Sequence, residues 1–560
     1  MKSKKQLILP YFTAILICML VNLRQSQAQS DNNGDRRVTT SYFLSGATVI
    51  PSPGKILSDY DILFKNGIIV KVGKNLQAPS DAKEINGKSL FVYPGFIDFG
   101  NKSGVKAPEL PEKPGNFDSS NPNPEIAGIH PHFSAAKNYK FDENLEEEWR
   151  KLGFTIGQKL PMGQGMLPGS TAVVVYGDAG NNNLLTTMQS QFFQFSTIRG
   201  LYPHTKLAVM AKWRDLYQNT LLYEESLKLY EENKQIGRVK IDPVLNALLP
   251  VPQGKQPLLV SVKSELDLRR AVKMQDENNF ELILLGINEG DSAIPLLKSK
   301  EIGVVLSLDL PKDNFTDSLP KAKQGKDYEA LIKRGIEAYK DALSLASKYE
   351  KADIPFAFSS LGVDKKDLFK NLRLMIENGL SKEAALAALT SNPAKLLGIE
   401  EISGSISPGK MANMVVMTDS LFSKEAMVKM IISDGYLFDY SEGAKLTDGK
   451  NQIWNYTAET PVGQSKGTWE FVQNDDKWEG TVSYDSPKGT GIKTSEMKDL
   501  VKTEDTLSFS FSIETNEEVL EVTVSGDMDQ NNFEGKMNIK GYNQFTVKAS
   551  KKDKPNKIHE

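Results

Sequence analysis

The sequence predicts an α/β fold: a TIM-like (β/α)8 barrel with a flanking small β-sandwich, followed by a C-terminal antiparallel β-domain. Three patterns support this prediction. Apolar strands alternate with helices through residues 207–358, which is typical of parallel strands joined by crossover helices. Asn66-Gly67 is a hairpin signal in an all-β region before them. Residues 508–513 alternate serine with large apolar residues, as a half-buried antiparallel strand does.

Length and composition indicate a multidomain protein with a large core, since the chain has 560 residues and 39% of them are hydrophobic. The formal net charge of −3 excludes a broad electrostatic attraction to nucleic acid or anionic membranes. The expected segments are a signal peptide at 1–29, a composite β-sandwich at 42–93 and 400–440, a barrel at 94–399 and a C-terminal β-barrel-like domain at 466–550.

The N-terminus reads as a secretory signal. Three lysines precede the apolar run Leu7 to Val21, and Ser26-Gln27-Ala28 offers a small-x-small cleavage site. An uncleaved anchor is the alternative, but Pro10 interrupts a run that is short for a membrane span. We therefore expect an exported protein, periplasmic or extracellular, with no transmembrane span after signal removal. Cys18, the only cysteine, lies inside the signal, so no disulfide is expected.

The elements follow from local patterns taken along the chain. Ser264 and Ser381 are expected as N-caps of helices, because a serine hydroxyl accepts from the first free backbone N–H groups. Residues 107–140 form a long Pro- and Asn-rich loop, and 441–466 read as a polar linker. Strands are expected at 43–50, 61–73, 82–91, 172–176, 258–262, 281–285, 303–308 and 354–358, and helices at 144–152, 208–232, 264–278, 292–300, 328–348 and twice within 365–398.

One stretch carries a family resemblance. In Pro94-Gly95-Phe96-Ile97-Asp98, proline fixes φ and glycine permits a tight turn before a short apolar strand. This stretch resembles the first barrel strand of the amidohydrolase superfamily, where the same motif runs into a His-x-His pair. Residues 65–73 and 390–416 are similar to the sandwich and C-terminal signatures of exported imidazolonepropionase-like and dipeptidase-like members. The family usually has aspartate where Asn413 stands.

The resemblance implies a catalytic zinc or another divalent metal at the carboxyl ends of the barrel strands. The family's ligand positions fall here on Gly100 and Lys102, and close to Ser261, Gly286 and Ser360, none of which is a ligand type. The sequence therefore predicts no metal, no cofactor and no catalytic residue of the family kind.

Candidate ligand-binding residues are those that the resemblance places at the barrel mouth: Asp98, Lys102, Ser261, Asn288 and Ser360. Lys102 could occupy the vacated cation position and pair with Asp98 or with a bound anion. A solvated lysine at a strand end is the simpler alternative, because exposure is the usual state of lysine.

Histidines offer little for a rebuilt metal site. The chain has four, and His130-Pro131-His132 matches His-x-His only superficially, because it lies in the long loop rather than after the motif. Proline within a parallel strand would also remove a ladder donor. A surface pair is the expected reading.

Three functions remain open at this stage. The first is an exported, non-hydrolysing member of the family that binds a small-molecule ligand or pairs with a homologous amidohydrolase subunit, and does not bind nucleic acid. The second is an active hydrolase of C–N bonds that uses His130, His132 and acidic residues in a rearranged site. The third is a module that binds a ligand through its C-terminal β-domain.

Overall fold

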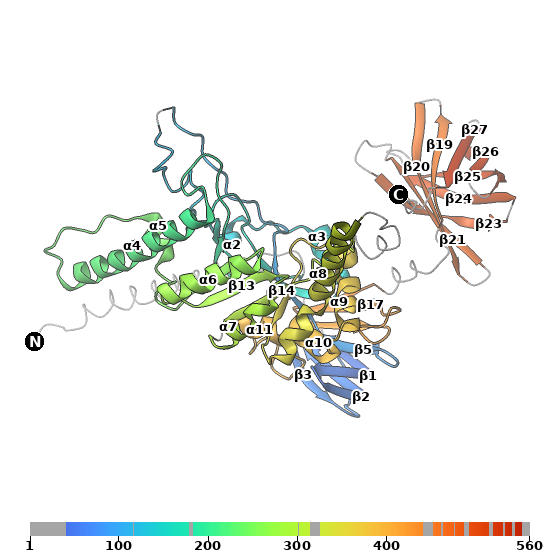
Figure 1. The fold of residues 1–560 in the computed structure, drawn as a ribbon. Coiled ribbons are helices and arrows are strands. Elements are labelled where there is room, and N and C mark those ends of the chain that lie inside the picture. Colours follow the sequence, from blue (N-terminus) through green and yellow to red (C-terminus); the bar gives the residue numbers. More distant parts are fainter. Residues whose placement is uncertain are drawn as a thin grey trace, which may run out of the picture. The chain divides into compact units, whose positions relative to one another are not determined.

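The chain divides into two compact units, residues 1–440 and 441–560, and each is described by itself. The predicted signal peptide at 1–29 lies outside the residues that the structure describes. The computed structural model (Figure 1) describes residues 41–551 except 116, 178–182, 301, 314–324, 441–451, 461–462, 475–476, 486–491, 504, 515–518, 530–531 and 540–543.

The flanking sheet of the first unit combines strands from both ends of that unit. Its order is β18-β17-β16-β5-β1-β2-β3, and β4 pairs with β1 in parallel. β5 pairs antiparallel with β16, so the chain returns to its first sheet after completing the barrel. The strands are β1 (Ser41–Ser52), β2 (Lys55–Lys65), β3 (Ile68–Gly73), β4 (Ala82–Asn86), β5 (Phe91–Pro94), β16 (Met414–Met417), β17 (Val428–Ser433) and β18 (Tyr436–Asp439).

Two further sheets make the barrel, in the orders β10-β9-β7-β6 and β15-β14-β13-β12-β11-β8. Strands β11 to β15 are all parallel neighbours, as the strand–helix alternation predicts. The strands are β6 (Phe96–Asn101), β7 (Phe154–Lys159), β8 (Gly169–Ser170), β9 (Ala172–Val175), β10 (Leu184–Thr186), β11 (Gln191–Gln194), β12 (Leu258–Ser261), β13 (Leu282–Ile287), β14 (Gly303–Ser307) and β15 (Ala357–Ser359).

One part of the barrel departs from the predicted regular (β/α)8 pattern. β9 runs antiparallel to β7, and β8 runs antiparallel to β11. The connection from β7 to β9, residues 160–171, contains no helix, whereas a parallel crossover is usually made by a helix. The chain therefore turns back directly, and the regular strand–helix alternation begins only after β11.

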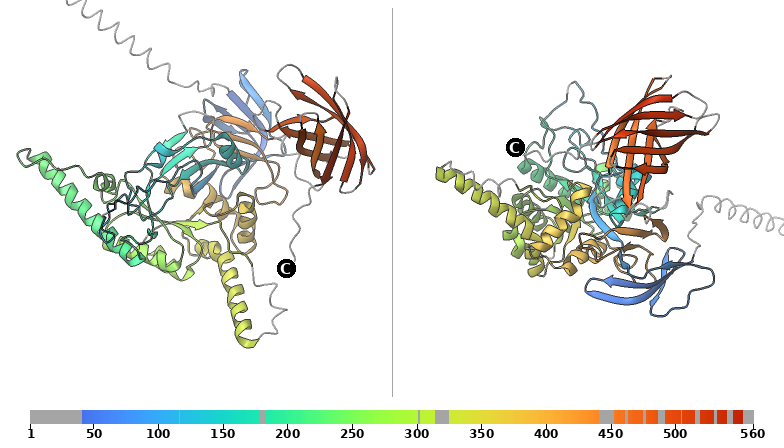
Figure 2. Two further views of the ribbon diagram at one scale, coloured as in Figure 1. Left: turned by 90° about the horizontal axis from the view of Figure 1, so that it is seen from above. Right: turned by 90° about the vertical axis from the view of Figure 1, so that its right-hand side faces the viewer.

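Helices cover the outside of the barrel (Figure 1), and α4 and α8 extend beyond its body (Figure 2). The expected helix at Ser381–Leu397 is two helices, because Thr390 at φ −133° and ψ −83° interrupts it. The helices are α2 (Ala135–Asn138), α3 (Glu143–Lys151), α4 (Lys206–Glu232), α5 (Pro243–Leu248), α6 (Glu265–Glu277), α7 (Ile294–Lys298), α8 (Gly325–Lys351), α9 (Leu368–Glu377), α10 (Lys382–Leu389) and α11 (Ser391–Leu396).

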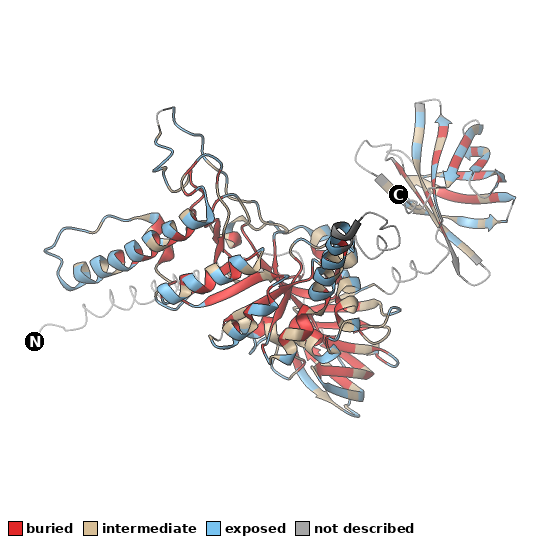
Figure 3. Cartoon of the chain, in the orientation of Figure 1, coloured by how far each residue is buried: buried red, intermediate tan, exposed pale blue. Residues whose placement is uncertain are grey.

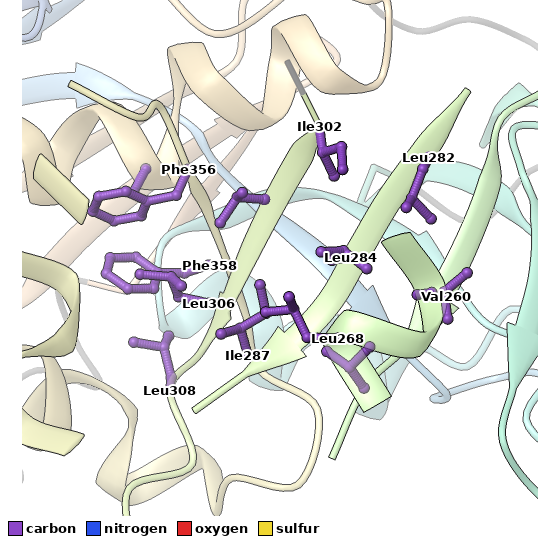
Figure 4. Close-up of a cluster of buried hydrophobic side chains, with 14 of the residues drawn as sticks. Val260, Leu268, Leu282, Leu284, Ile287, Ile302, Leu306, Leu308, Phe356 and Phe358 are labelled. Atoms are coloured by element: carbon purple, nitrogen blue, oxygen red, sulfur yellow. The ribbon is translucent and has the colours of Figure 1, made fainter. Parts of the chain in front are cut away.

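Apart from β10 at the edge of its sheet, the barrel strands are buried on both faces (Figure 3), which requires apolar residues in succession. One face packs against helices, as Leu268 of α6 does against Val260 and Leu284 (Figure 4). The other face fills the barrel interior with alternate residues from eight strands: Ile97, Phe99, Ile156, Val173, Val175, Phe192, Leu259, Ile283, Leu285, Val305 and Ala357. The interior is therefore a packed apolar core.

The second unit is a single antiparallel sheet in the order β22-β21-β20-β19-β27-β26-β25-β24-β23. It begins at Gln452, earlier than the expected residue 466, because β19 pairs along its length with β20 and lies within the stretch read as linker. One face buries its own aromatic core, which includes Trp454, Trp469 and Phe509. The strands are β19 (Gln452–Thr460), β20 (Gly463–Asn474), β21 (Lys477–Asp485), β22 (Ile492–Glu496), β23 (Lys498–Lys502), β24 (Thr506–Glu514), β25 (Val519–Met528), β26 (Asn532–Ile539) and β27 (Gln544–Lys551).

Across the residues that the structure describes, no helix combines the length and apolarity needed to span a membrane.

Candidate functional site

Side chains, rather than a backbone ladder, join the first and last described barrel strands, β6 and β15. The Ser359 hydroxyl donates to the backbone oxygen of Gly100 at 2.9 Å. Ser360 donates twice to the Asp98 carboxylate, from its backbone N–H at 2.9 Å and from its hydroxyl at 2.6 Å. Asp98 and Ser360, both candidate ligand-binding residues, therefore bind each other and close the barrel.

A buried polar network continues from Asp98 across β7 and β9. The Asn101 amide donates to Asp98 at 2.7 Å and to the Tyr176 hydroxyl at 3.1 Å. The Lys159 ammonium donates to Asn101 at 3.1 Å, to Ser103 at 2.9 Å and to Tyr176 at 3.2 Å. Lys159 thus uses three donors on three neutral oxygens, and Asn101 links it to the carboxylate.

The environment of Lys159 disfavours its charge. Burial lowers the pKa of Lys159 to about 7, although the nearby carboxylates of Glu146 and Asp98 favour the charged form. Burial likewise raises the pKa of Asp98, despite its hydrogen bonds from Ser360 and Asn101. Burial also raises the pKa of Glu146 to about 7.

Helix α3 and the end of the long loop cover this network. The Trp149 indole donates to Ser103 at 3.2 Å, and the Tyr139 hydroxyl donates to Glu146. The Lys159 ammonium lies 5.5 Å from the centre of the Tyr139 ring, within range of a cation–π contact. A Cβ at Gly157 would collide with the Tyr176 hydroxyl, so the network depends on glycine there.

The position of the first family metal ligand does not fit a metal in this chain. Gly100 has φ +108°, and a Cβ there would lie 3.3 Å from a methyl carbon of both Leu160 and Leu285. A histidine side chain would have to displace these leucines from the apolar interior. Moreover, within the described ranges no three His, Cys, Asp or Glu residues gather to hold a metal ion. We therefore derive no catalytic step through a metal.

The other candidate residues lie apart from the network. Lys102 is exposed, so the suggested pair with Asp98 is wrong, and the alternative of a solvated lysine holds. Asp98 instead receives its hydrogen bonds from Asn101 and Ser360. Ser261 is half-buried at the end of β12, and Asn288 is exposed just after β13.

The long loop closes the mouth of the barrel over β7 and β8. Isolated β-bridges pair Ile129 with Leu167 and Ser134 with Ser170. Its two histidines do not converge: the rings are 6.1 Å apart between centroids, His130 is buried, and His132 is exposed. Burial lowers the pKa of His130, and its Nε2 has no hydrogen-bond partner.

The mouth is open over β12, β13 and β14, where a cavity of about 700 Å³ lies. Residues just after these strands line one wall, and α8 forms the other with Gly335 and Ala338. Carboxyl ends of parallel strands are the usual place for ligands in barrel folds. The polar groups drawn from the three strand ends include Lys263, Asn288, Asp309 and Lys312.

These features describe a barrel whose interior is apolar and which has a cavity between three of its strand ends and α8. A family model described as the amidohydrolase family matches residues 281–438. A crystal structure of an amidohydrolase from Thermotoga maritima MSB8 matches with a TM-score of 0.60 at 21% identity, covering 71% of this chain and 100% of that one. The chain thus has the amidohydrolase-superfamily fold, which the sequence motifs predict.

Two prolidase structures match with lower TM-scores. A prolidase complexed with N-methylphosphonate-L-proline matches at a TM-score of 0.43 and 16% identity, over 71% of this chain and all of that one. A putative prolidase from Bifidobacterium longum matches at a TM-score of 0.40 and 14% identity, over 72% of this chain and 95% of that one. No curated protein sequence matches this chain.

The sequence reasoning missed the residues that build the network: Asn101, Glu146, Lys159 and Tyr176. A signal for one of them was present, because Lys159 ends a strand whose other residues are uncharged, FTIGQK. A charge within a buried strand is rare enough to indicate a specific partner.

Proposed function

We propose that this chain is an exported, non-hydrolysing protein of the amidohydrolase fold that binds a small molecule at its barrel mouth. The main support is the environment of Gly100, where Leu160 and Leu285 take the space that a metal-binding side chain would need. The family's hydrolysis depends on a metal that activates water and polarises the carbonyl. An apolar interior offers neither a ligand nor room for that chemistry.

The hydrolase alternative has weaker support. It requires His130 and His132 to share a metal with acidic residues, but one ring is buried and the other is exposed. The C-terminal module alternative is also weaker, because the buried face of that unit is packed with aromatic side chains such as Trp469 and Phe509.

Metal content and amide hydrolysis, measured on the same purified full chain, test the proposal. After growth with zinc and manganese, we expect far less than one metal ion per chain. We also expect no chelator-sensitive hydrolysis of any compound in a library of small amides. His130→Ala is the matched variant and should change neither result. One bound metal per chain together with chelator-sensitive hydrolysis would overturn the proposal.

A further inference from the structure

A cavity lies over the ends of β12, β13 and β14, apart from the part of the barrel that the network occupies. Lys263 follows β12, Asn288 follows β13, and Asp309 and Lys312 follow β14. The ends of neighbouring parallel strands lie side by side, so these groups face one space. Its volume of about 700 Å³ suits a small molecule rather than a polymer.

Most acidic groups around this cavity already have partners. Asp291 and Asp341 both accept from Lys348, at 2.8 and 2.9 Å. Glu265 pairs with Arg269, and Glu289 accepts the backbone N–H of Glu265 at 2.8 Å. These contacts hold the N-terminus of α6 and the adjacent loops in place, so those carboxylates already have partners within the protein.

Three charged groups remain without a partner in the part of the chain that the structure describes: the Asp309 carboxylate and the ammonium groups of Lys263 and Lys312. Partial burial raises the pKa of Asp309, which indicates a carboxylate whose hydration is incomplete and whose charge nothing offsets. Gly362 leaves the space that Asp309 occupies, because a Cβ there would lie 2.8 Å from its Oδ2.

The opposite wall is mostly apolar. Helix α8 lines the cavity with Gly335, Ala338, Tyr339, Ala342 and Leu345, and Leu310 adds an apolar side chain from the end of β14. Asp341 of α8 also lines the cavity, but its carboxylate accepts from Lys348. The small side chains and the Tyr339 ring together offer an apolar surface for the body of a ligand. The cavity therefore offers unpaired charges of both signs beside an apolar surface.

We propose that this cavity binds a small amphoteric molecule that carries an ammonium group, a carboxylate and an apolar body. Asp309 receives the ammonium group, Lys263 and Lys312 receive the carboxylate, and the apolar body lies on α8. This inference rests on the proposed function, because it names the ligand class of the same barrel mouth. Charge-assisted hydrogen bonds of both signs would give the site its selectivity.

Calorimetric titration of the full chain with leucine, N-acetylleucine and leucinamide tests the site. We expect leucine to bind, and each blocked form, which lacks one charge, to bind at least ~10-fold more weakly. Asp309→Asn should abolish the preference for leucine over N-acetylleucine. The double variant K263M/K312M should abolish the preference for leucine over leucinamide.

Lys340→Met and Asp353→Asn are matched controls, because both residues are exposed and neither lines this cavity. They should leave all three affinities unchanged, and circular dichroism should show every variant folded. Equal binding of the three compounds, or no binding of leucine at about 10 mM, would overturn the site.

The same titrations separate this inference from the proposed function. N-acetylleucine and leucinamide each contain one amide bond, so their cleavage can be followed by chromatography. Cleavage together with charge-selective binding would overturn the non-hydrolysing role and leave the site standing. If neither cleavage nor charge-selective binding is observed, the proposed ligand site is overturned and the non-hydrolysing role is not.

Discussion

The two halves of the barrel mouth use charge in opposite ways. On the side of β6, β7 and β15, Asp98 and Lys159 are buried, and their hydrogen bonds come from within the protein. On the side of β12 to β14, Lys263 and Asp309 face a cavity without partners among the described residues. A buried charge needs hydrogen-bond partners within the protein, whereas a charge at an open cavity can pair with a bound ligand. The first half therefore stabilises the barrel, and the second is available for binding.

The largest effect should come from removing the carboxylate of the closed half. Asp98→Ala removes the acceptor of three hydrogen bonds and leaves buried donors on Asn101 and Ser360 unpaired. We expect the free energy of unfolding to fall by about 3 kcal/mol or more, measured by urea denaturation. Asp364→Ala, at an exposed ion pair with Lys366, is the control and should cost less than about 1 kcal/mol. Equal losses for both variants would contradict the closing role of Asp98.

Restoring the first family ligand should destabilise the protein rather than recruit a metal. Gly100→His places a side chain against Leu160 and Leu285 and should cost about 2–3 kcal/mol in urea unfolding. Gly254→His also forces a side chain at positive φ, but nothing lies within 4 Å of its Cβ. The difference between the two variants reports the packing cost together with the greater backbone strain at φ +108° than at φ +66°. A well-folded zinc-binding Gly100→His protein would refute the account.

The pKa of Lys159 predicts a pH dependence for the closed half. The folded-state pKa is about 7 against the ordinary 10.5, so between these values the unfolded chain binds a proton that the folded chain does not. Stability should therefore rise with pH from about 7 to 10.5, by up to about 1 kcal/mol per pH unit. Lys159→Met should remove this rise in urea unfolding at several pH values, and an unchanged profile would exclude Lys159 as its source.

The smallest effect on stability is expected in the open half. Asn288→Ala changes an exposed side chain that lines the cavity, so the free energy of unfolding should shift by less than about 0.5 kcal/mol. A loss as large as that of Asp98→Ala would remove the distinction between the two halves.

The fold was largely predictable, because its signals are local. Asn66-Gly67 and the serine N-caps report on neighbouring residues, and Ser381 does accept from the backbone N–H of Ala384 at 3.0 Å. The reversed direction of β9 was missed, because an apolar strand has the same composition whether it runs parallel or antiparallel. Only the absence of a helical pattern between β7 and β9 favours the antiparallel arrangement.

The candidate site was less predictable, because its contacts join distant parts of the chain. The motif placed Asp98 correctly on the first barrel strand, β6, but its partner is Ser360 rather than Lys102. No sequence pattern around Lys159 or Tyr176 predicts that their side chains hydrogen-bond to each other beside Asn101. Spacing in the sequence identified strand ends, and tertiary packing decided which of their side chains are buried.

The pairing of β5 with β16 has a consequence for how the protein is made. Synthesis must deliver the last strands of this unit before the first ones can complete their sheet. Contacts between such distant segments form slowly. A nascent chain built this way cannot complete its first sheet until β16 has emerged.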